Sequence, residues 1–316
     1  DEFTGINHPL DDIQKFIKTN FDRKFIDISC IRKSDIDLEE LTYYQSNYSK
    51  PRKYACIFVH YDKDSLISAD CVHHIEKLSD YCDLFFVSSS EYLDKSPEEI
   101  EKIKPFCKQI LIRKNSGYDF GCWSHVIRKN YSQLCEYEGV LLANDSNWGP
   151  LKDFSDTFSK INNLLAEVDF IGLTSSTTPS WHLQSFFIIY SKKVFESSYF
   201  KQHWFNVGLH NSKIDIIMSY EVDWCTRLKR LGFCGMSLYG ESTASNPTHE
   251  NWKELLESNY PYLKKELLRD NPLVIDLQHL SEIISAYQED WRRHILEYLR
   301  RYGKENSDIV AFFPES

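Results

Sequence analysis

The sequence predicts an α/β fold in which an open, mostly parallel sheet is flanked by helices and followed by a helical C-terminal extension. Between about residues 54 and 143, short apolar runs alternate with segments of helical periodicity, which is the rhythm of βαβ units. After residue 250 the strand-like runs stop, and helical patterns continue to about residue 304. We therefore divide the chain into a helical or irregular lead-in (1–50), an α/β domain (51–250) and a helical extension (251–316).

The first half of the α/β domain contains four predicted strands with helices between them. The strands are apolar runs at residues 55–59, 82–90, 108–113 and 139–143. The intervening helices are predicted at residues 68–81, 96–106 and 123–131. The second of these begins with an N-cap serine and an acidic first turn. The lead-in contains one amphipathic segment, around Ile13, Phe16 and Ile17.

The second half continues with "DFIGLTSS" (169–176) and "LQSFFIIYSKKVF" (183–195), which are predicted strands, and with a helix that ends near Gly232. The C-terminal helical pattern places Trp291 and Ile295 on an apolar stripe beside Arg300 and Arg301. A basic amphipathic helix can lie on an anionic membrane as a peripheral contact. We favour packing of this helix on the α/β domain.

Composition excludes several classes of protein. The chain has 316 residues, of which 42% are hydrophobic and 27% charged, as in ordinary globular proteins. Its net charge of -10 argues against nonspecific nucleic-acid binding. The nine cysteines include no CxxC pair, which predicts reduced thiols in a cytoplasmic protein without a zinc site or disulfide framework. No apolar run reaches the length of a membrane span, and the N-terminus has no signal-peptide pattern.

Three polar clusters follow predicted strands, at residues 60–62 ("HYD"), 115–119 ("NSGYD") and 144–146 ("NDS"). In a doubly wound sheet, the carboxyl ends of such strands face one crevice, where ligands bind. The sequence contains no glycine-rich phosphate loop. A divalent cation, Mg²⁺ or Mn²⁺, is the expected substitute, because these ions are shared between carboxylates and phosphates. Such an ion also neutralises charge on a departing diphosphate.

This order of motifs resembles that of GT-A glycosyltransferases and, more narrowly, of the rhamnan synthesis protein F family of bacterial polysaccharide rhamnosyltransferases. The matching stretches are "NSGYDFGCW", "LLANDSNWGPL", "DFIGLT", "HLQSFFIIYSKKVF" and "NPTHENWKELLESNYPYLKKELLRDNP", within residues 54–273. The resemblance implies a nucleotide-diphospho-sugar transferase fold and an inverting transfer of L-rhamnose from dTDP-L-rhamnose. The implied acceptor is a growing cell-surface polysaccharide of O-antigen or rhamnan type, as a free oligosaccharide or a lipid-linked glycan.

The resemblance also implies which residues bind the donor. Asp145, with Asn144 beside it, falls where GT-A enzymes carry the DXD motif that holds the metal and the nucleotide sugar. Here the motif has one carboxylate where many relatives have two, which puts strong metal dependence in doubt. His60 is predicted to lie near the nucleotide. His249 sits where some GT-A folds supply a late metal ligand, and is equally compatible with a helix-entry role.

The 115–119 cluster matches the loop that lines the nucleotide pocket in similar enzymes, through Asn115, Gly117 and Asp119. Asp119 is equally compatible with capping the helix that follows it.

The catalytic base implied by the resemblance is Glu221, in the segment "EVDWCTRLKRLG". A carboxylate serves as base when it reaches the acceptor hydroxyl. The alternative role of Glu221 is that of a first-turn acid favoured by the helix dipole. Asp223 is the second candidate, and its alternative role is to orient Arg227 one turn along the helix.

The acceptor sugar is predicted to contact Gln184, Ser185 and Trp181. Gln184 and Ser185 are equally compatible with an internal hydrogen-bond network, and packing is the alternative for Trp181. Two other functions remain open. One is a phosphosugar transferase of capsule synthesis, which would release a nucleoside monophosphate. The other is a non-catalytic carbohydrate-binding module of a larger synthase.

Overall fold

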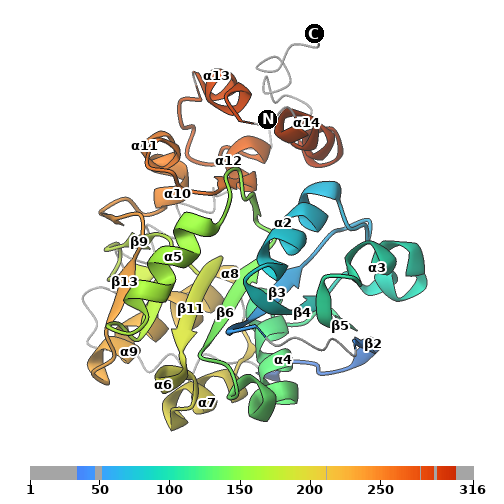
Figure 1. Cartoon of the computed structure of the whole chain (residues 1–316), viewed down its shortest axis with the longest axis vertical. Coiled ribbons are helices and arrows are strands. Elements are labelled where there is room, and N and C mark those ends of the chain that lie inside the picture. The colour runs from blue at the N-terminus through green and yellow to red at the C-terminus, as the bar shows by residue number, and fades with distance from the viewer. Residues whose placement is uncertain (1–33, 47–51, 211, 278, 288–289, 304–316) are drawn as a thin grey trace, which may run out of the picture.

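The computed structural model describes residues 34–46, 52–210, 212–277, 279–287 and 290–303. An eight-stranded sheet in the order β13-β8-β11-β6-β3-β4-β5-β2 forms its centre (Figure 1). In chain order these strands are β2 (Glu40–Gln45), β3 (Tyr54–His60), β4 (Cys82–Ser88), β5 (Cys107–Arg113), β6 (Gly139–Asn144), β8 (Phe170–Gly172), β11 (Phe187–Ser191) and β13 (Gly235–Ser237).

The middle of the sheet is parallel, as predicted. The pairs β6·β3, β3·β4 and β4·β5 are all parallel. The four strands predicted in the first half of the domain are therefore confirmed as adjacent strands, whose carboxyl ends meet at one edge. β11 runs antiparallel between β6 and β8. The predicted strands in "DFIGLTSS" and "LQSFFIIYSKKVF" are thus confirmed as β8 and β11.

The prediction that residues 1–50 form only helical or irregular structure was wrong at residues 40–45, which form the strand β2. This strand pairs antiparallel with β5 at the edge of the sheet. Its sequence, "ELTYYQ", is too polar to look like a buried strand, but Leu41 and Tyr44 pack on the apolar core. Half-exposed edge strands show this mixture of charged and β-favouring residues. The amphipathic segment around Ile13, Phe16 and Ile17 lies outside the described residues.

Each face of the sheet has its own apolar core. Along β3, Ala55, Ile57 and Val59 belong to one core, and Cys56 and Phe58 to the other, because successive side chains of a strand point to opposite faces. The helices of the first core are α4 (Tyr118–Leu134), α7 (Ser198–Phe205) and α9 (Asp223–Arg230). Those of the second are α2 (Ala69–Ser79), α3 (Pro97–Ile103) and α5 (Ser155–Leu164) (Figure 1). The shorter helices are η2 (Glu91–Lys95), α6 (Lys192–Phe195) and α8 (Lys213–Ile217), with a π-helical turn, η3 (Met218–Val222), after α8.

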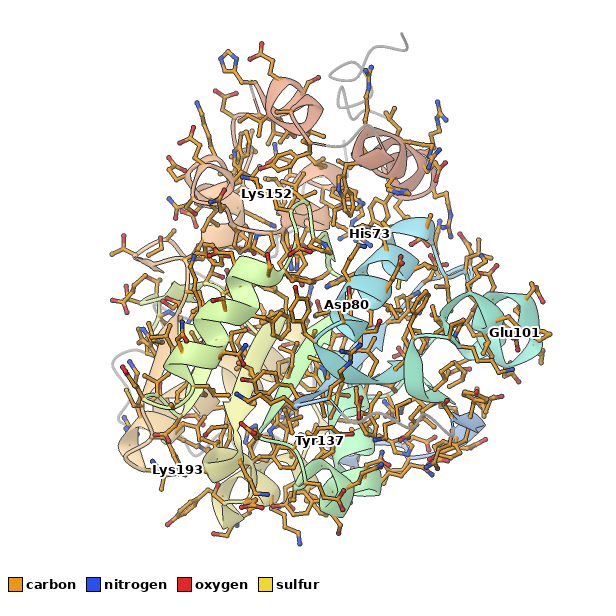
Figure 2. All side chains as sticks on the ribbon, in the orientation of Figure 1. His73, Asp80, Glu101, Tyr137, Lys152 and Lys193 are labelled. Atoms are coloured by element: carbon orange, nitrogen blue, oxygen red, sulfur yellow. The ribbon has the colours of Figure 1, made fainter. Side chains whose placement is uncertain are left out.

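The C-terminal helices gather at one end of the molecule, beside α2 (Figure 1). They are α10 (Pro247–Glu250), α11 (Trp252–Glu257), α12 (Lys265–Arg269), α13 (Leu280–Ser285) and α14 (Asp290–Tyr302). Trp291 and Ile295 are buried in a third apolar cluster together with Trp148. Figure 2 shows His73 on α2, on the side of the C-terminal helices. Its ring lies edge-on to that of Trp291, with the ring centroids 5.2 Å apart. The predicted packing of the amphipathic helix on the α/β domain is confirmed.

A short strand ties this extension to the sheet. β15 (Leu263–Lys264) pairs antiparallel with β7 (Asn147–Trp148), directly after β6. The remaining short strands are β1 (Ser34–Asp35), β9 (Ser175–Ser176), β10 (His182–Leu183), β12 (Gly208–Leu209) and β14 (Glu241–Ser242). Within the described ranges, every helix is too short or too polar to serve as a membrane-spanning segment. The described cysteines are free thiols, and Cys56 and Cys122 are among those that are buried.

Candidate active site

A cavity of about 620 Å³ opens at the carboxyl ends of β3 and β6. Its walls are the loops after these strands, the first turns of α2 and α4, part of α3 with Glu99 and Lys102, and the C-terminal helices α12 and α14. The polar residues that line it include His60, Tyr61, Asp62, Asp70, Asp119, Asp145, Lys265, Arg269, Tyr298, Arg301 and Tyr302. Of the predicted donor-site residues, the cavity brings together His60, Asp119 and Asp145.

Asp145 lies directly after β6 and faces the end of β3. Its Oδ2 accepts a hydrogen bond from the backbone N–H of Tyr61 at 3.2 Å and lies 4.0 Å from Nε2 of His60. His60 is buried, and its Nδ1 is 3.0 Å from the hydroxyl of Ser88. Burial lowers the pKa of His60, against the opposing charges of Asp145 and Asp62. His60 is therefore a neutral neighbour of the Asp145 carboxylate at pH 7.

The other two residues of the "NDS" motif form a chain of hydrogen bonds. The Ser146 hydroxyl donates to Oδ1 of Asn144 at 2.6 Å, and Nδ2 of Asn144 donates to Oδ2 of Asp119 at 2.8 Å. Asn144 thus fixes the Asp119 carboxylate beside the end of β6. Burial, and then the charge of Asp145, raise the pKa of Asp119 from 3.8 to about 6. The Asp145 carboxylate is therefore close enough to disfavour ionisation of Asp119.

The cap of α4 is Gly117, so the alternative role of Asp119 as the cap of this helix does not apply. Gly117 has φ +80°, and a Cβ there would lie 2.7 Å from Cγ2 of Ile36. Only glycine fits this turn without strain, and the turn delivers Asp119 to the cavity. Asn115 is exposed, its N–H donates to Glu91 at 2.9 Å, and it is not among the cavity-lining residues. Its contact with the nucleotide stays a prediction.

Glu221 lies inside a continuous helical run, and the prediction that it begins a helix was wrong. It belongs to the π-helical turn between α8 and α9. Its Oε2 accepts a hydrogen bond from the backbone N–H of Ser185 at 2.8 Å, and its Oε1 lies 3.8 Å from Nε2 of His182. A helix-dipole role does not apply here, because Glu221 is two turns from the start of the run. π-turns of this kind occur frequently at functional sites.

Asp223 follows on α9, and its Oδ2 lies 2.5 Å from Nε of Arg227. This is the ion pair that the alternative role of Asp223 requires.

The predicted acceptor residues are already engaged with neighbouring side chains. Gln184 accepts a hydrogen bond from Thr174 at 2.8 Å and donates to Asn246 at 3.0 Å, which is the internal network given above as its alternative role. The ammonium of Lys229 lies 3.2 Å from the ring centroid of Trp181. Ser185 contacts Glu221 through its backbone. Acceptor binding by these residues stays a prediction.

His249 is buried on α10, and within the described part of the chain neither of its ring nitrogens has a hydrogen-bond partner. Its Nε2 lies 3.6 Å from Oε2 of Glu266. Burial, and then the charge of Lys264, lower the pKa of His249 to about 4. The side chain is therefore neutral at pH 7, the form in which histidine binds metals. His249 does not line the cavity that holds Asp145, and its role as a metal ligand stays a prediction.

No three His, Cys, Asp or Glu side chains of the described residues gather into a metal-binding cluster. Asp119 and Asp145 nevertheless share the cavity, and the charge of Asp145 raises the pKa of Asp119. One or two carboxylates completed by phosphate oxygens are a common ligand set for Mg²⁺. The residues present therefore fit a divalent cation that is shared with a phosphorylated substrate.

Sequence reasoning missed the cationic side of the cavity, which comes from the C-terminal helices. Lys265 forms an ion pair with Asp70 at 2.7 Å, and both side chains are buried. Arg301 contacts both carboxylate oxygens of Asp62 at 3.1 Å and Asp64 at 3.0 Å. The Tyr302 hydroxyl also donates to Asp62. We call this contact of Asp62 and Asp64 with Arg301 and Tyr302 the α14 clasp.

Comparisons with known proteins identify the family of this chain. The sequence profile of the rhamnan synthesis protein F family matches residues 46–306. The chain is 27% identical over 140 residues to the uncharacterised protein y4gN of Sinorhizobium fredii, covering 44% of this chain and 37% of y4gN. It is 24% identical over 234 residues to the virulence protein VirA of Vibrio anguillarum, covering 60% of this chain and 74% of VirA.

Among solved structures, a CMP:2-keto-3-deoxy-manno-octonic acid synthetase complexed with CTP aligns with 65% of this chain and 98% of its own, at 11% identity and a TM-score of 0.38. That likeness is too slight to bear on the fold or the site. The family match, in contrast, begins before β3 and reaches past α14, so that it includes the strands from β3 onward, the cavity and the C-terminal helices. The chain belongs to the rhamnan synthesis protein F family.

Proposed function

We propose that the protein is an inverting glycosyltransferase that transfers L-rhamnose from dTDP-L-rhamnose to a growing cell-surface polysaccharide. The observation that carries this proposal is the cavity, in which Asp119 and Asp145 share one chamber with Lys265, Arg269 and Arg301. Cationic side chains suit the phosphates of a nucleotide sugar, and the carboxylates suit a cation or sugar hydroxyls. Membership of a family named for rhamnan synthesis supports rhamnose as the sugar.

In the proposed reaction, Glu221 is the base. An acceptor hydroxyl attacks the anomeric carbon of the donor from the face opposite the diphosphate. The bond from that carbon to the phosphate oxygen breaks, its electron pair leaves with dTDP, and Glu221 takes the hydroxyl proton. The Ser185 N–H holds one carboxylate oxygen of Glu221, which orients the other. Acceptor contacts near Ser185 and Trp181 follow from this assignment.

A divalent cation belongs to the proposal as a cofactor. Asp145, with Asp119 beside it, would hold Mg²⁺ or Mn²⁺ together with the donor phosphates, and the ion would neutralise charge on the leaving diphosphate. Asp145 and Asp119 themselves place negative charge at the end of β6, which disfavours a diphosphate unless cations compensate it.

A binding panel and a product assay together test this function. Thermal unfolding is followed with dTDP, UDP, GDP and CMP, each with EDTA or with Mn²⁺. A ligand at 100 times its Kd stabilises the fold by about 2.7 kcal/mol, so we expect dTDP to produce the largest shift.

In the product assay, dTDP-L-rhamnose is incubated with the protein and a rhamnan oligosaccharide, and nucleotides are separated by chromatography. Release of dTDP supports the proposal, and release of dTMP indicates a phosphosugar transferase. Oligosaccharide binding without turnover, unchanged in Asp145→Asn and Glu221→Gln, indicates a binding module.

A further inference from the structure

Two consecutive lysines reach the end of β6 from a distant part of the chain. Because β15 pairs with β7, Lys264 stands opposite Asn147, and the Lys265 N–H donates to the carbonyl of Ser146 at 3.1 Å. Lys264 is 118 residues from Ser146 in sequence. The two lysines therefore flank the "NDS" motif, in which Asp145 is the candidate donor-site carboxylate.

Of the two lysines, Lys265 already has a counterion. Its ammonium lies 2.7 Å from Asp70, and both side chains are buried. Burial alone would lower the pKa of Lys265, but the charges of Asp70 and Asp145 outweigh burial and raise it. Lys265 thus remains protonated and anchors the end of β15 to α2.

Lys264 forms no ion pair with any described carboxylate. Its ammonium donates to the Ser146 hydroxyl at 3.0 Å and lies 5.6 Å from the ring centroid of Phe186. Through Ser146 and Asn144 it begins the hydrogen-bond chain that ends on the Asp119 carboxylate. In this series of hydrogen bonds, Lys264 donates to Ser146, Ser146 donates to Asn144, and Asn144 donates to Asp119. Because all donors point the same way, the positive charge of Lys264 polarises each of these hydrogen bonds.

The surroundings of Lys264 lower its pKa. Burial is the largest cause, the charge of Lys213 adds to it, and the charges of Glu266, Glu221 and Asp119 oppose it. The charges of the candidate base Glu221 and of the cavity carboxylate Asp119 therefore act on Lys264 at longer range than a direct ion pair. A half-buried ammonium without a counterion is unfavourable, and an anionic ligand would supply the missing partner.

We propose that Lys264 is a donor-binding residue whose ammonium contacts the phosphate oxygens of a nucleoside diphosphate, with Lys265 as the positioning residue that fixes it beside the "NDS" motif. This inference rests on the proposed function. It also gives a physical reason for the single carboxylate in the motif. A carboxylate in place of the Ser146 hydroxyl would pair with Lys264 and cancel the charge that the diphosphate requires.

The test measures binding of dTDP and of inorganic pyrophosphate by calorimetry, in EDTA and in Mn²⁺. Lys264→Met should raise both Kd values in EDTA about 10- to 100-fold, as expected for loss of a charge-assisted contact. Lys264→Arg should recover part of the loss. Lys253→Met, which removes an exposed lysine of α11, should bind like the wild type.

A second variant covers the case in which Lys264→Met fails to fold. Ser146→Asp keeps Lys264 but gives it a counterion, and in EDTA it should weaken pyrophosphate binding as Lys264→Met does. Suppose that the wild type binds dTDP and that Lys264→Met leaves both Kd values unchanged. This result overturns the inference about Lys264 but not the proposed function. If only Ser146→Asp folds, unchanged Kd values in that variant have the same meaning. A lowered Tm with unchanged affinity assigns Lys264 a structural role. If the wild type binds no nucleoside diphosphate, both the inference and the proposed function fail.

Discussion

Replacing Asp119 by asparagine should stabilise the ligand-free protein at pH 8. Asp119 is half-buried, and burial together with the Asp145 charge raises its pKa to about 6. At pH 8 the folded state must therefore hold an ionised group that its surroundings disfavour. Asparagine has the same shape, carries no charge, and its Oδ1 accepts the same hydrogen bond from Asn144.

The magnitude follows from the shift of the pKa from 3.8 to about 6, roughly two units. Each unit corresponds to about 1.4 kcal/mol, which gives an upper limit of about 3 kcal/mol. Because Asp119 is partly exposed, solvent screening reduces this to about 1–2 kcal/mol. A raised pKa means that the contribution of Asp119 to stability is complete below pH ~4 and is lost as the pH rises through about 6. The extra free energy of unfolding of Asp119→Asn over the wild type should therefore grow between pH ~4 and about 6 and stay constant above pH ~7.

The assay is urea unfolding of the wild type and Asp119→Asn at pH 4.5, 6 and 8. Asp153→Asn is the matched control, because the pKa of Asp153 is shifted in the opposite direction from that of Asp119. The pKa of Asp153 is lowered by hydrogen bonds from Ser155, so the control should be less stable than the wild type at pH 8. If Asp119→Asn is no more stable than the wild type at pH 8, or if its advantage does not depend on pH, the burial argument is refuted. The stabilised variant should also show a raised KM for the donor and an unchanged KM for the acceptor.

Three further predictions concern the cavity and the base. Asp145→Asn should weaken dTDP binding about 10- to 100-fold and abolish any Mn²⁺ response in calorimetry. Unchanged dTDP binding and an unchanged Mn²⁺ response would contradict the donor-site role of Asp145. Glu221→Gln should lower kcat and kcat/KM together by ~10²–10⁴-fold, with donor Kd preserved. Asp223→Asn, measured in parallel, should stay active because its carboxylate is already held in an ion pair, and the reverse pattern would make Asp223 the base. Arg301→Met should lower stability by about 1 kcal/mol at pH 7. Burial alone would raise the pKa of Asp62, but hydrogen bonds and the contacts of the α14 clasp outweigh burial and lower it. The stability that Arg301 contributes through Asp62 should therefore fade in urea titrations as the pH falls below about 4 and Asp62 becomes protonated.

Local sequence patterns were sufficient to predict the strands and the meeting of the polar clusters. β3 to β6 are continuous apolar runs, and such runs with helices between them can form little else than a parallel sheet. That topology alone brings His60, Asp119 and Asp145 to one edge. β2 was missed because an edge strand buries one side only, so its apolar signal is half as strong.

The rest of the site depends on contacts that no local pattern encodes. Lys264 and Lys265 lie in "YPYLKKELL" (260–268), which looks like part of an ordinary amphipathic helix, and only the β15·β7 pairing brings them to the "NDS" motif. The π-helical turn at Glu221 could not be predicted, because the helical periodicity of this segment does not distinguish a π-turn from an α-helical turn. The basic stripe around Arg301 was visible in the sequence, but its partner, Asp62, was not.

The α14 clasp has a consequence for how the chain folds during translation. Arg301 follows Asp62 by 239 residues, so the earliest and latest walls of the cavity are separated by most of the chain. The parallel strands can associate through short βαβ connections soon after they emerge, since domains fold as they are synthesised. The clasp must instead close a very long loop, whose entropic cost grows with its length. We expect a translating chain to form its sheet well before its cavity is complete, so that a nascent molecule cannot bind a ligand in this cavity until α14 has docked.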